Sequence, residues 1–202
     1  MTTTTAQKRR ITRHIENMGS PDIDTSARAC DYLIRYYGVR ALDELLEASS
    51  HPNPIMRYRA AWALGHTHDP RAFEAILRLT DDPDEAVRYD STIALGILDD
   101  ERAIEPLKAI WLQNDDTKPA CEAFFRMGPK TVYAVEDVLA NESSSIRWTA
   151  MILFARLAER HGDARSIEML ETCLNDSCKG IRVDAGYRLN EIREQQQAGK
   201  EL

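Results

Sequence analysis

The stretches MRYRAAWALG (residues 56–65) and VRYDSTIALG (residues 87–96) decide the fold, because they repeat one pattern 31 residues apart. Each has an apolar residue before an arginine, small residues three and four places after the arginine, and a leucine seven places after it. This is the spacing of one helix face. Weaker copies are IRWTAMILF (146–154), IRVDAGYRL (181–189) and a copy ending at Met127 and Gly128, in which Ala120 replaces the arginine. We name these segments the B helices, and their small residues predict close helix packing.

A second motif alternates with the first. It reads RALDEL (40–45), RAFEAI (71–76) and RAIEPL (102–107), with weaker copies KTVYAV (130–135) and RSIEML (165–170). Apolar residues stand at the third and sixth positions of each copy, which is typical of a helix with one buried face. We name these segments the A helices. Two helical motifs that alternate along the chain predict an array of helix pairs.

The positions of proline and glycine indicate where the helices of these pairs start and end. A possible capping residue precedes a proline at Asn53–Pro54, Asp69–Pro70, Asp82–Pro83 and Gly128–Pro129, which predicts helix starts there. Gly65 and Gly96 directly follow the leucine of the repeated pattern, so we expect them to end helices in the left-handed conformation. Pro106 lies inside an A motif and should bend that helix.

These signals predict an all-α fold of about six helix pairs in a single domain over residues 7–195. The expected pairs lie at about 7–37, 39–65, 71–97, 102–127, 130–160 and 165–195. The first pair matches the motifs poorly, as expected of a repeat that caps the end of an array. Residues 1–6 are expected to be a disordered tail and residues 196–202 a frayed C-terminus.

The two motifs resemble the HEAT-like repeats first recognised in phycobilisome lyases, over residues of about 39–193. The resemblance implies a right-handed α-α superhelix in which the A helices form the convex layer and the B helices the concave layer. The family includes bilin lyase subunits, scaffolds and adaptor proteins, so the resemblance does not by itself fix a function.

Composition excludes several classes of protein. The chain has 202 residues and a net charge of −7, with no apolar stretch long enough for a transmembrane helix. The N-terminus has no apolar segment typical of a secretion signal, and four cysteines make no disulfide framework. We therefore expect a cytoplasmic protein without a membrane partner, and the acidic balance argues against nucleic acid as the main partner.

The arginine that opens each B helix has two interpretations. Arg57, Arg88, Arg147 and Arg182 would stack along the array. In the structural interpretation they form a ladder on acidic residues or carbonyls of neighbouring turns, with Asp82, Asp84 and Asp176 as candidate partners. In the alternative they face a ligand. A buried, paired arginine is costly to break, so the structural interpretation predicts that truncation destabilises the protein.

The face of each B helix opposite its core side is unexpectedly apolar. One place after the arginine stand Tyr58, Tyr89, Cys121, Trp148 and Val183, and five places after it stand Trp62, Ile93, Phe125, Ile152 and Tyr187. These side chains either pack sideways against adjacent B helices or form an aromatic groove, and exposed apolar patches commonly mark binding sites. Two places after the arginine stand Arg59, Asp90, Glu122, Thr149 and Asp184. These residues would form a mostly acidic rim, which suits a partly basic partner.

The sequence contains no strong motif for catalysis or metal binding. No phosphate-binding loop, nucleophile elbow or dinucleotide fingerprint is present, and no histidine precedes a glutamate as in the di-iron hydroxylases of HEAT-like type. His66, His68 and Asp69 could hold a metal, but a solvated or capping role fits one isolated cluster better. Cys173 and Cys178 lack two further ligands. We therefore expect no metal or cofactor, and an enzyme is the less favoured alternative.

The leading hypothesis is a non-catalytic scaffold or adaptor that binds a peptide or protein in the groove. Its anchors would be Tyr58, Trp62, Tyr89, Ile93, Phe125, Trp148, Ile152 and Tyr187, with Arg59, Asp90 and Glu122 at the rim. The alternative is a bilin lyase or bilin-handling protein, in which the groove holds a tetrapyrrole beside Asp90, Glu122 and Asp184. A DNA-repair repeat protein is a minor alternative, because phosphate binding requires a dense basic lining and this face supplies only Arg59.

Overall fold

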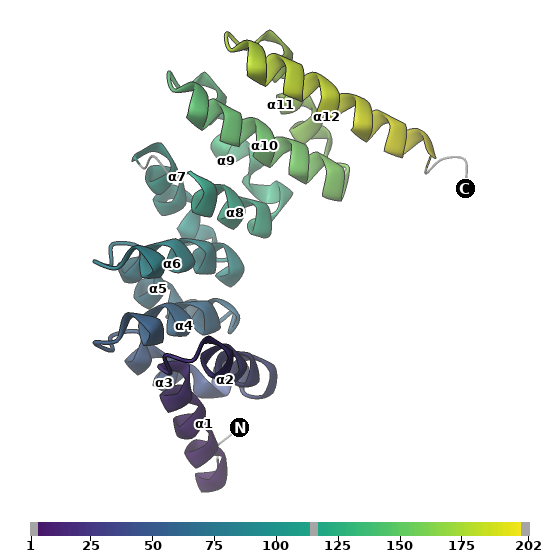
Figure 1. Ribbon diagram of the computed structural model, residues 1–202. Helices are drawn as coiled ribbons and strands as arrows, with labels where there is room; N and C mark the ends of the chain where they lie inside the picture. The colour runs from purple at the N-terminus through teal and green to yellow at the C-terminus, as the bar shows by residue number, and fades with distance from the viewer. Residues whose placement is uncertain (1–3, 114–116, 199–202) are drawn as a thin grey trace. The chain divides into compact units, whose positions relative to one another are not determined.

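The computed structural model describes residues 4–113 and 117–198, which form helices and no strand (Figure 1). The all-α helical-repeat class predicted from the sequence is confirmed. The chain divides into two compact units, residues 1–107 and residues 108–202. The single domain predicted for residues 7–195 stays a prediction.

The N-terminal unit contains three helix pairs. They are α1 (Thr5–Met18) with α2 (Ile23–Tyr36), α3 (Leu42–Ala48) with α4 (Pro54–Gly65), and α5 (Phe73–Leu79) with α6 (Glu85–Leu98). The B helices α4 and α6 pack directly on each other (Figure 1), and α2 packs on α4. Fully buried Leu33, Leu42, Leu64, Ile76 and Leu95 form the core of this unit.

The C-terminal unit contains the later pairs, and the boundary between the units falls within α7 (Ile104–Gln113). The remaining helices are α8 (Lys118–Met127), α9 (Val132–Val135), α10 (Ser144–His161), α11 (Ala164–Thr172) and α12 (Lys179–Ala198). The helix α10 packs on α8, α11 and α12. Trp111, Phe124 and Phe154 are fully buried, and a core cluster around Met151, Leu170 and Ile181 joins α10, α11 and α12.

Four of the A helices begin with a turn of 3-10 helix. These turns are Gly38–Ala41, Pro70–Ala72, Glu101–Ala103 and Pro129–Thr131. Because of the turn before it, α7 begins only at Ile104, and Pro106 is its third residue. The first turn of an α-helix leaves its N–H groups without intrahelical partners, so a proline fits there. The bend expected at Pro106 stays a prediction, and the proline's place in the first turn gives a reason for its being tolerated there.

The predicted helix starts are only partly right. The side chains of Asn53 and Asp69 accept hydrogen bonds from the backbone N–H of Ile55 and Arg71, as expected of caps. Asp82 does not cap α6, because that helix begins at Glu85 and Asp84 is its N-cap. The Asp82 carboxylate instead accepts from the Asp84 N–H at 2.9 Å.

The expectation that Gly65 and Gly96 end helices in the left-handed conformation is wrong. Both lie within helices, and among the described non-glycine residues it is His68 (φ 50°) and Asp99 (φ 61°) that adopt positive φ. Gly65 is needed for packing: a Cβ there would lie 2.8 Å from the carbonyl oxygen of Ala94 on α6. The small residue therefore permits the close approach of α4 and α6.

The chain ends differ from the expected tails. Thr4 caps α1, which begins at Thr5, so the predicted disordered segment 1–6 is partly helical. The helix α12 continues to Ala198 and includes part of the C-terminal segment predicted to fray. Residues 1–3 and 199–202 of the predicted tails lie outside the described residues.

Candidate functional site

The arginines of the B helices bind the turns between helices. Arg57 donates from Nε and Nη2 to the two carboxylate oxygens of Asp82, each at 2.7 Å, and from Nη1 to the carbonyl oxygens of His51 and Pro52. Arg88 donates from Nη1 to the carbonyl oxygens of Asp82 and Pro83. The turn at Asp82 thus joins α4 to α6 through two successive arginines.

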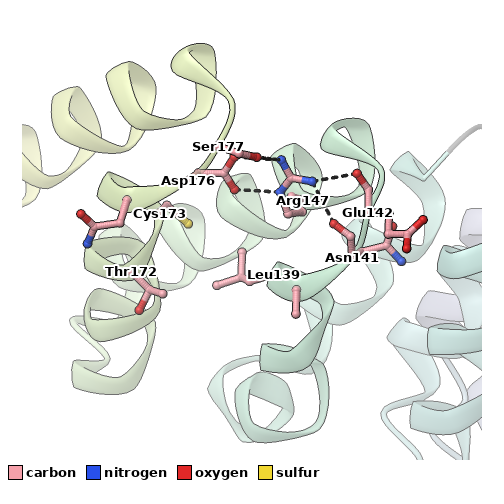
Figure 2. A pocket seen from close by; sticks show the side chains of 10 residues that line it. Leu139, Asn141, Glu142, Arg147, Thr172, Cys173, Asp176 and Ser177 are labelled. Atoms are coloured by element: carbon pink, nitrogen blue, oxygen red, sulfur yellow. Dashed lines mark hydrogen bonds and ion pairs between the residues drawn. The ribbon is translucent and has the colours of Figure 1, made fainter.

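The same arrangement recurs in the C-terminal unit (Figure 2). Arg147 donates from Nε to Asp176 at 2.8 Å and from Nη2 to Asp176 and Ser177, each at 2.9 Å. Its Nη1 donates to the carbonyl oxygens of Asn141 and Glu142. Arg182 donates to the carbonyl oxygens of Asp176 and Ser177. All five N–H groups of Arg147 are therefore used, and none is left for a ligand.

Electrostatics hold both carboxylates ionised. Hydrogen bonds from Arg147 lower the pKa of Asp176 below its ordinary value, and hydrogen bonds from Arg57 do the same to the pKa of Asp82. Both pairs are largely shielded from water, with side chains 14% and 6% exposed for Arg57 and Asp82 and 10% and 8% exposed for Arg147 and Asp176. These contacts are structural ion pairs.

A hollow of about 610 Å³ lies beside the second pair, between the turn at Asn141 and the turn at Asp176 (Figure 2). Arg147 and Cys173 are among the residues that line it. Cys173 is buried, and burial raises the pKa of its thiol to about 12, so the reactive thiolate is scarce at neutral pH. The hollow offers no activated nucleophile and no open arginine.

In the N-terminal unit the expected groove residues are mostly covered. Ile93 is 7% exposed, which removes it from the set of open anchors. Tyr58 is half-buried with the Arg59 guanidinium 5.0 Å from its ring centre, and Trp62 is half-buried against His66 at 5.3 Å between ring centres. Tyr89 is the most open member of the set in this unit, at 40% exposed.

The rim residues of the N-terminal unit also serve internal contacts. Arg59 donates from Nε to the hydroxyl of Ser26 at 3.2 Å. Asp90 is half-buried, and burial raises the pKa of its carboxyl while the charge of Arg59 opposes that rise. The single basic residue of this face is therefore engaged, which leaves the DNA-repair hypothesis without a phosphate-binding lining.

In the C-terminal unit, α8 and α10 share a compact charged cluster. Cys121 is buried, and Glu122 pairs with Arg126 and Arg156, each at 2.9 Å. The guanidinium carbon of Arg156 lies 3.7 Å from the ring centre of Phe125, which is half-buried. The sequence reasoning missed Arg156, although it stands nine places after Arg147, a position that flanks the apolar face.

The most open apolar surface on the B helices lies at the start of α10 and along α12. Trp148, Val183 and Tyr187 are 39%, 48% and 68% exposed. A Cβ on Gly180 would lie 3.5 Å from the Trp148 ring, so the two helices meet there. Ile152 is half-buried and packs against the core cluster. We define Trp148, Val183 and Tyr187 as the α10–α12 patch.

Metal and membrane sites find little support in the described residues. Across residues 4–113 and 117–198 no three histidine, cysteine or acidic side chains gather in a way that could hold a metal ion. Cys173 and Cys178 are free thiols. Each helix in that part of the chain falls short of the length or hydropathy needed to cross a bilayer.

Comparison with known proteins identifies the repeat type. Residues 41–124 match the family model of HEAT repeats, whereas no curated protein matches the chain. A solved structure of the complex of CpcE and CpcF of phycocyanin lyase from Nostoc sp. PCC7120 is 18% identical with a TM-score of 0.52, covering 87% of this chain and 74% of that chain. The Cnd3-Cnd2 subcomplex of S. pombe condensin is 16% identical with a TM-score of 0.62, covering 92% of this chain and 28% of that chain.

At these identities the two structures show a shared fold and carry no function over to this chain. They agree with the family match in repeat type and with the alternating motifs in the sequence. The resemblance to HEAT-like repeats is therefore confirmed, with residues 41–124 as the part of the chain that matches the family model.

Proposed function

We propose that the protein is a non-catalytic binding module that docks a protein or peptide partner on the α10–α12 patch. The observation that carries the proposal is the exposure of Trp148 and Tyr187, at 39% and 68%, on helices whose other faces form the core. At the equivalent positions of the N-terminal unit, Tyr58 and Trp62 are half-buried, Ile93 is buried, and Tyr89 alone is open, at 40%. We therefore place the anchors at the C-terminal members of the predicted series, where three open apolar side chains occur on two helices that meet.

The physical basis is the cost of leaving these side chains in water. Burying one large apolar side chain contributes about 1.5–3 kcal/mol, and tryptophan and tyrosine are enriched among the residues that dominate binding energy. Val183 and Tyr187 are four residues apart on one face of α12, and Trp148 lies beside that helix. Together they offer an apolar anchor of the size that a short helix or peptide segment can cover.

The test is a double substitution, Trp148→Ala with Tyr187→Ala. Both side chains are substantially exposed, so we expect thermal stability to change little while capture of a partner from the native host's extract is lost. The matched control is Tyr133→Ala, because Tyr133 is 71% exposed on α9, outside the patch. Capture should survive the control. Unfolding of the double variant, or equal capture by all three proteins, would contradict the proposal.

A tetrapyrrole is the second candidate ligand, because exposed flat rings at Trp148 and Tyr187 can stack on a flat conjugated molecule. Two of the three acid–base residues expected for a bilin lyase are not available at the patch, because Glu122 is paired with Arg126 and Arg156 and Asp90 is half-buried in the other unit. The third, Asp184, directly follows Val183 on α12 and would be the acid–base residue beside a bound tetrapyrrole. Mixing the protein with phycocyanobilin and recording the visible spectrum decides the point, since an unchanged spectrum removes the tetrapyrrole as a candidate.

A further inference from the structure

The helix α1 carries a basic face that the proposed function does not use. Arg9, Arg10 and Arg13 are exposed, and at about 100° per residue they lie within one arc of the helix. Buried Ile11 and Met18 lie on the opposite side and fix α1 to its neighbours. The three guanidinium groups therefore point away from the core, and we name them the α1 basic face.

These three arginines differ from several other arginines of the described chain in their lack of a carboxylate partner. In the described part of the chain, none of the three forms an ion pair, whereas Arg57, Arg147 and Arg165 are each paired with a carboxylate. The contrast is sharp in a chain with 33 acidic and 26 basic residues, where carboxylates are plentiful. Glu16 is exposed three residues after Arg13 on the same side of α1, yet no ion pair joins the two, so the three guanidinium groups remain available to an external anion.

The position of the cluster is locally unfavourable. Helix N-termini favour negative side chains, yet α1 has no acidic residue in its first turn, and neutral Gln7 completes the capping box with Thr4. Arg9 and Arg10 follow within the second turn. A bound carboxylate would reduce the repulsion between neighbouring guanidinium groups, which no acidic side chain in the first turn offsets.

The adjoining helix extends this surface with aromatic side chains. His14 stacks on Tyr32 of α2 with ring centres 4.1 Å apart, and Tyr32 lies 4.5 Å from Tyr36. Tyr36 is 52% exposed. The Ser26 hydroxyl donates to the Met18 carbonyl oxygen, and His14 stacks on Tyr32, so α1 and α2 run antiparallel. Arg10, one turn before His14, therefore lies near the level of Tyr36, one turn after Tyr32. The basic face is thus bordered by an exposed ring.

The negative charge of the rest of the chain favours a short anionic ligand on α1 over a long one. The net charge is −7 with these three arginines included, so the remainder of the chain is more negative still. A nucleic acid or a bilayer surface is anionic over a length much greater than one helix and requires a larger basic lining than three arginines in a chain with a net charge of −7. A short acidic segment can cover α1 alone.

We propose that the α1 basic face binds a short acidic peptide segment of a partner protein, with its carboxylates on Arg9, Arg10 and Arg13. Guanidinium groups match carboxylates through paired hydrogen bonds. The exposed ring of Tyr36 accommodates an apolar side chain between acidic ones. The surface lies in the N-terminal unit, so it is separate from the α10–α12 patch and from the function proposed for it.

The test is fluorescence anisotropy with a fluorescein-labelled peptide of eight glutamates, titrated with the full chain at about 0.15 M salt. Saturable binding is expected, and the triple variant Arg9→Gln, Arg10→Gln, Arg13→Gln should weaken it by at least about tenfold. The control triple variant Arg71→Gln, Arg78→Gln, Arg193→Gln changes the net charge equally at exposed sites and should stay within about threefold of the wild type.

Three outcomes would overturn the proposal. They are the absence of saturable peptide binding, equal weakening by the control variant, and tighter binding of oligothymidylate or phosphatidylserine vesicles through the same arginines. Hydrogen exchange of the backbone amides of residues 5–18 in each variant shows whether α1 remains folded. The Trp148→Ala, Tyr187→Ala variant should bind the peptide normally, so failure of this proposal is distinguishable from failure of the proposed function.

Discussion

At the scale of single residues, the arginine of the B helix does more than the repeat pattern indicates. The sequence places Arg57, Arg147 and their candidate partners Asp82 and Asp176 at corresponding positions, and the structure joins them in two-pronged ion pairs. The sequence does not reveal that each aspartate also accepts a hydrogen bond from the backbone N–H two residues later, as Asp176 does from Cys178. That bond depends on the conformation of the turn, which spacing alone cannot supply.

We predict that Asp176 stabilises the fold above pH 4 and that acid removes this contribution. Its pKa is lowered in the folded state, mainly by hydrogen bonds from Arg147. A group with a depressed folded pKa stabilises above its unfolded pKa of about 3.9 and loses that effect as the pH falls through the folded value. Asp176→Asn should therefore lower the free energy of unfolding by about 3 kcal/mol at pH 7, and the difference should shrink below pH 4.

Urea unfolding at several pH values measures this difference. Asp184→Asn on α12 is the control, because Asp184 forms no ion pair in the described residues and its removal should cost little. A difference between wild type and Asp176→Asn that stays constant from pH 7 to pH 3 would show that the ionised carboxylate is not what stabilises the fold.

At the scale of helices, the sequence predicts which segments are helical better than it predicts how each helix ends. The alternating motifs place α4, α6, α10 and α12 within a few residues of their observed bounds. Gly65 misleads because a glycine at the end of an apolar pattern usually marks a left-handed cap. Here it lies against the Ala94 backbone, a contact between repeats that a single helix pattern does not contain.

The same limit applies to the candidate site. Helical periodicity gives the direction of a side chain but not what covers it. Ile93 and Tyr187 occupy equivalent positions on α6 and α12, yet they are 7% and 68% exposed. Only the neighbouring helices decide between the two environments, so the sequence predicted the apolar face but not its open part.

We predict opposite effects for two glycine substitutions in B helices. In Gly65→Ala the new Cβ would lie 2.8 Å from a backbone oxygen that cannot move aside, so stability should fall by about 1–3 kcal/mol. In Gly186→Ala the nearest atom is the Cδ2 of Leu174 at 3.8 Å, an ordinary contact. Alanine should then stabilise α12 by about 0.5–1 kcal/mol through helix propensity.

Thermal unfolding of the two variants compares them directly. A lower midpoint for Gly65→Ala together with an equal or higher midpoint for Gly186→Ala is the expected result. If Gly65→Ala is neutral, α4 and α6 can separate at no cost, and close packing between the helices is not the reason for glycine at this position.

At the scale of the whole molecule, helical repeats distribute stability locally. Stability in such arrays is approximately a sum of terms for each repeat and for each interface between neighbours. The two compact units each have a buried core of their own, with Leu33 in the first and Leu170 in the second. A destabilising substitution in one core should therefore increase local unfolding mainly within its own unit.

We predict that hydrogen exchange will resolve this locality. Leu170→Ala empties part of the cluster that joins α10, α11 and α12, and such a cavity costs about 2–5 kcal/mol. Backbone amides of these three helices should exchange faster than in the wild type, while those of α1 to α3 change little. Leu33→Ala, also fully buried, should give the converse pattern. Uniform acceleration along the chain in both variants would instead mean that residues 7–195 unfold as one cooperative domain, since local opening then costs as much as global unfolding.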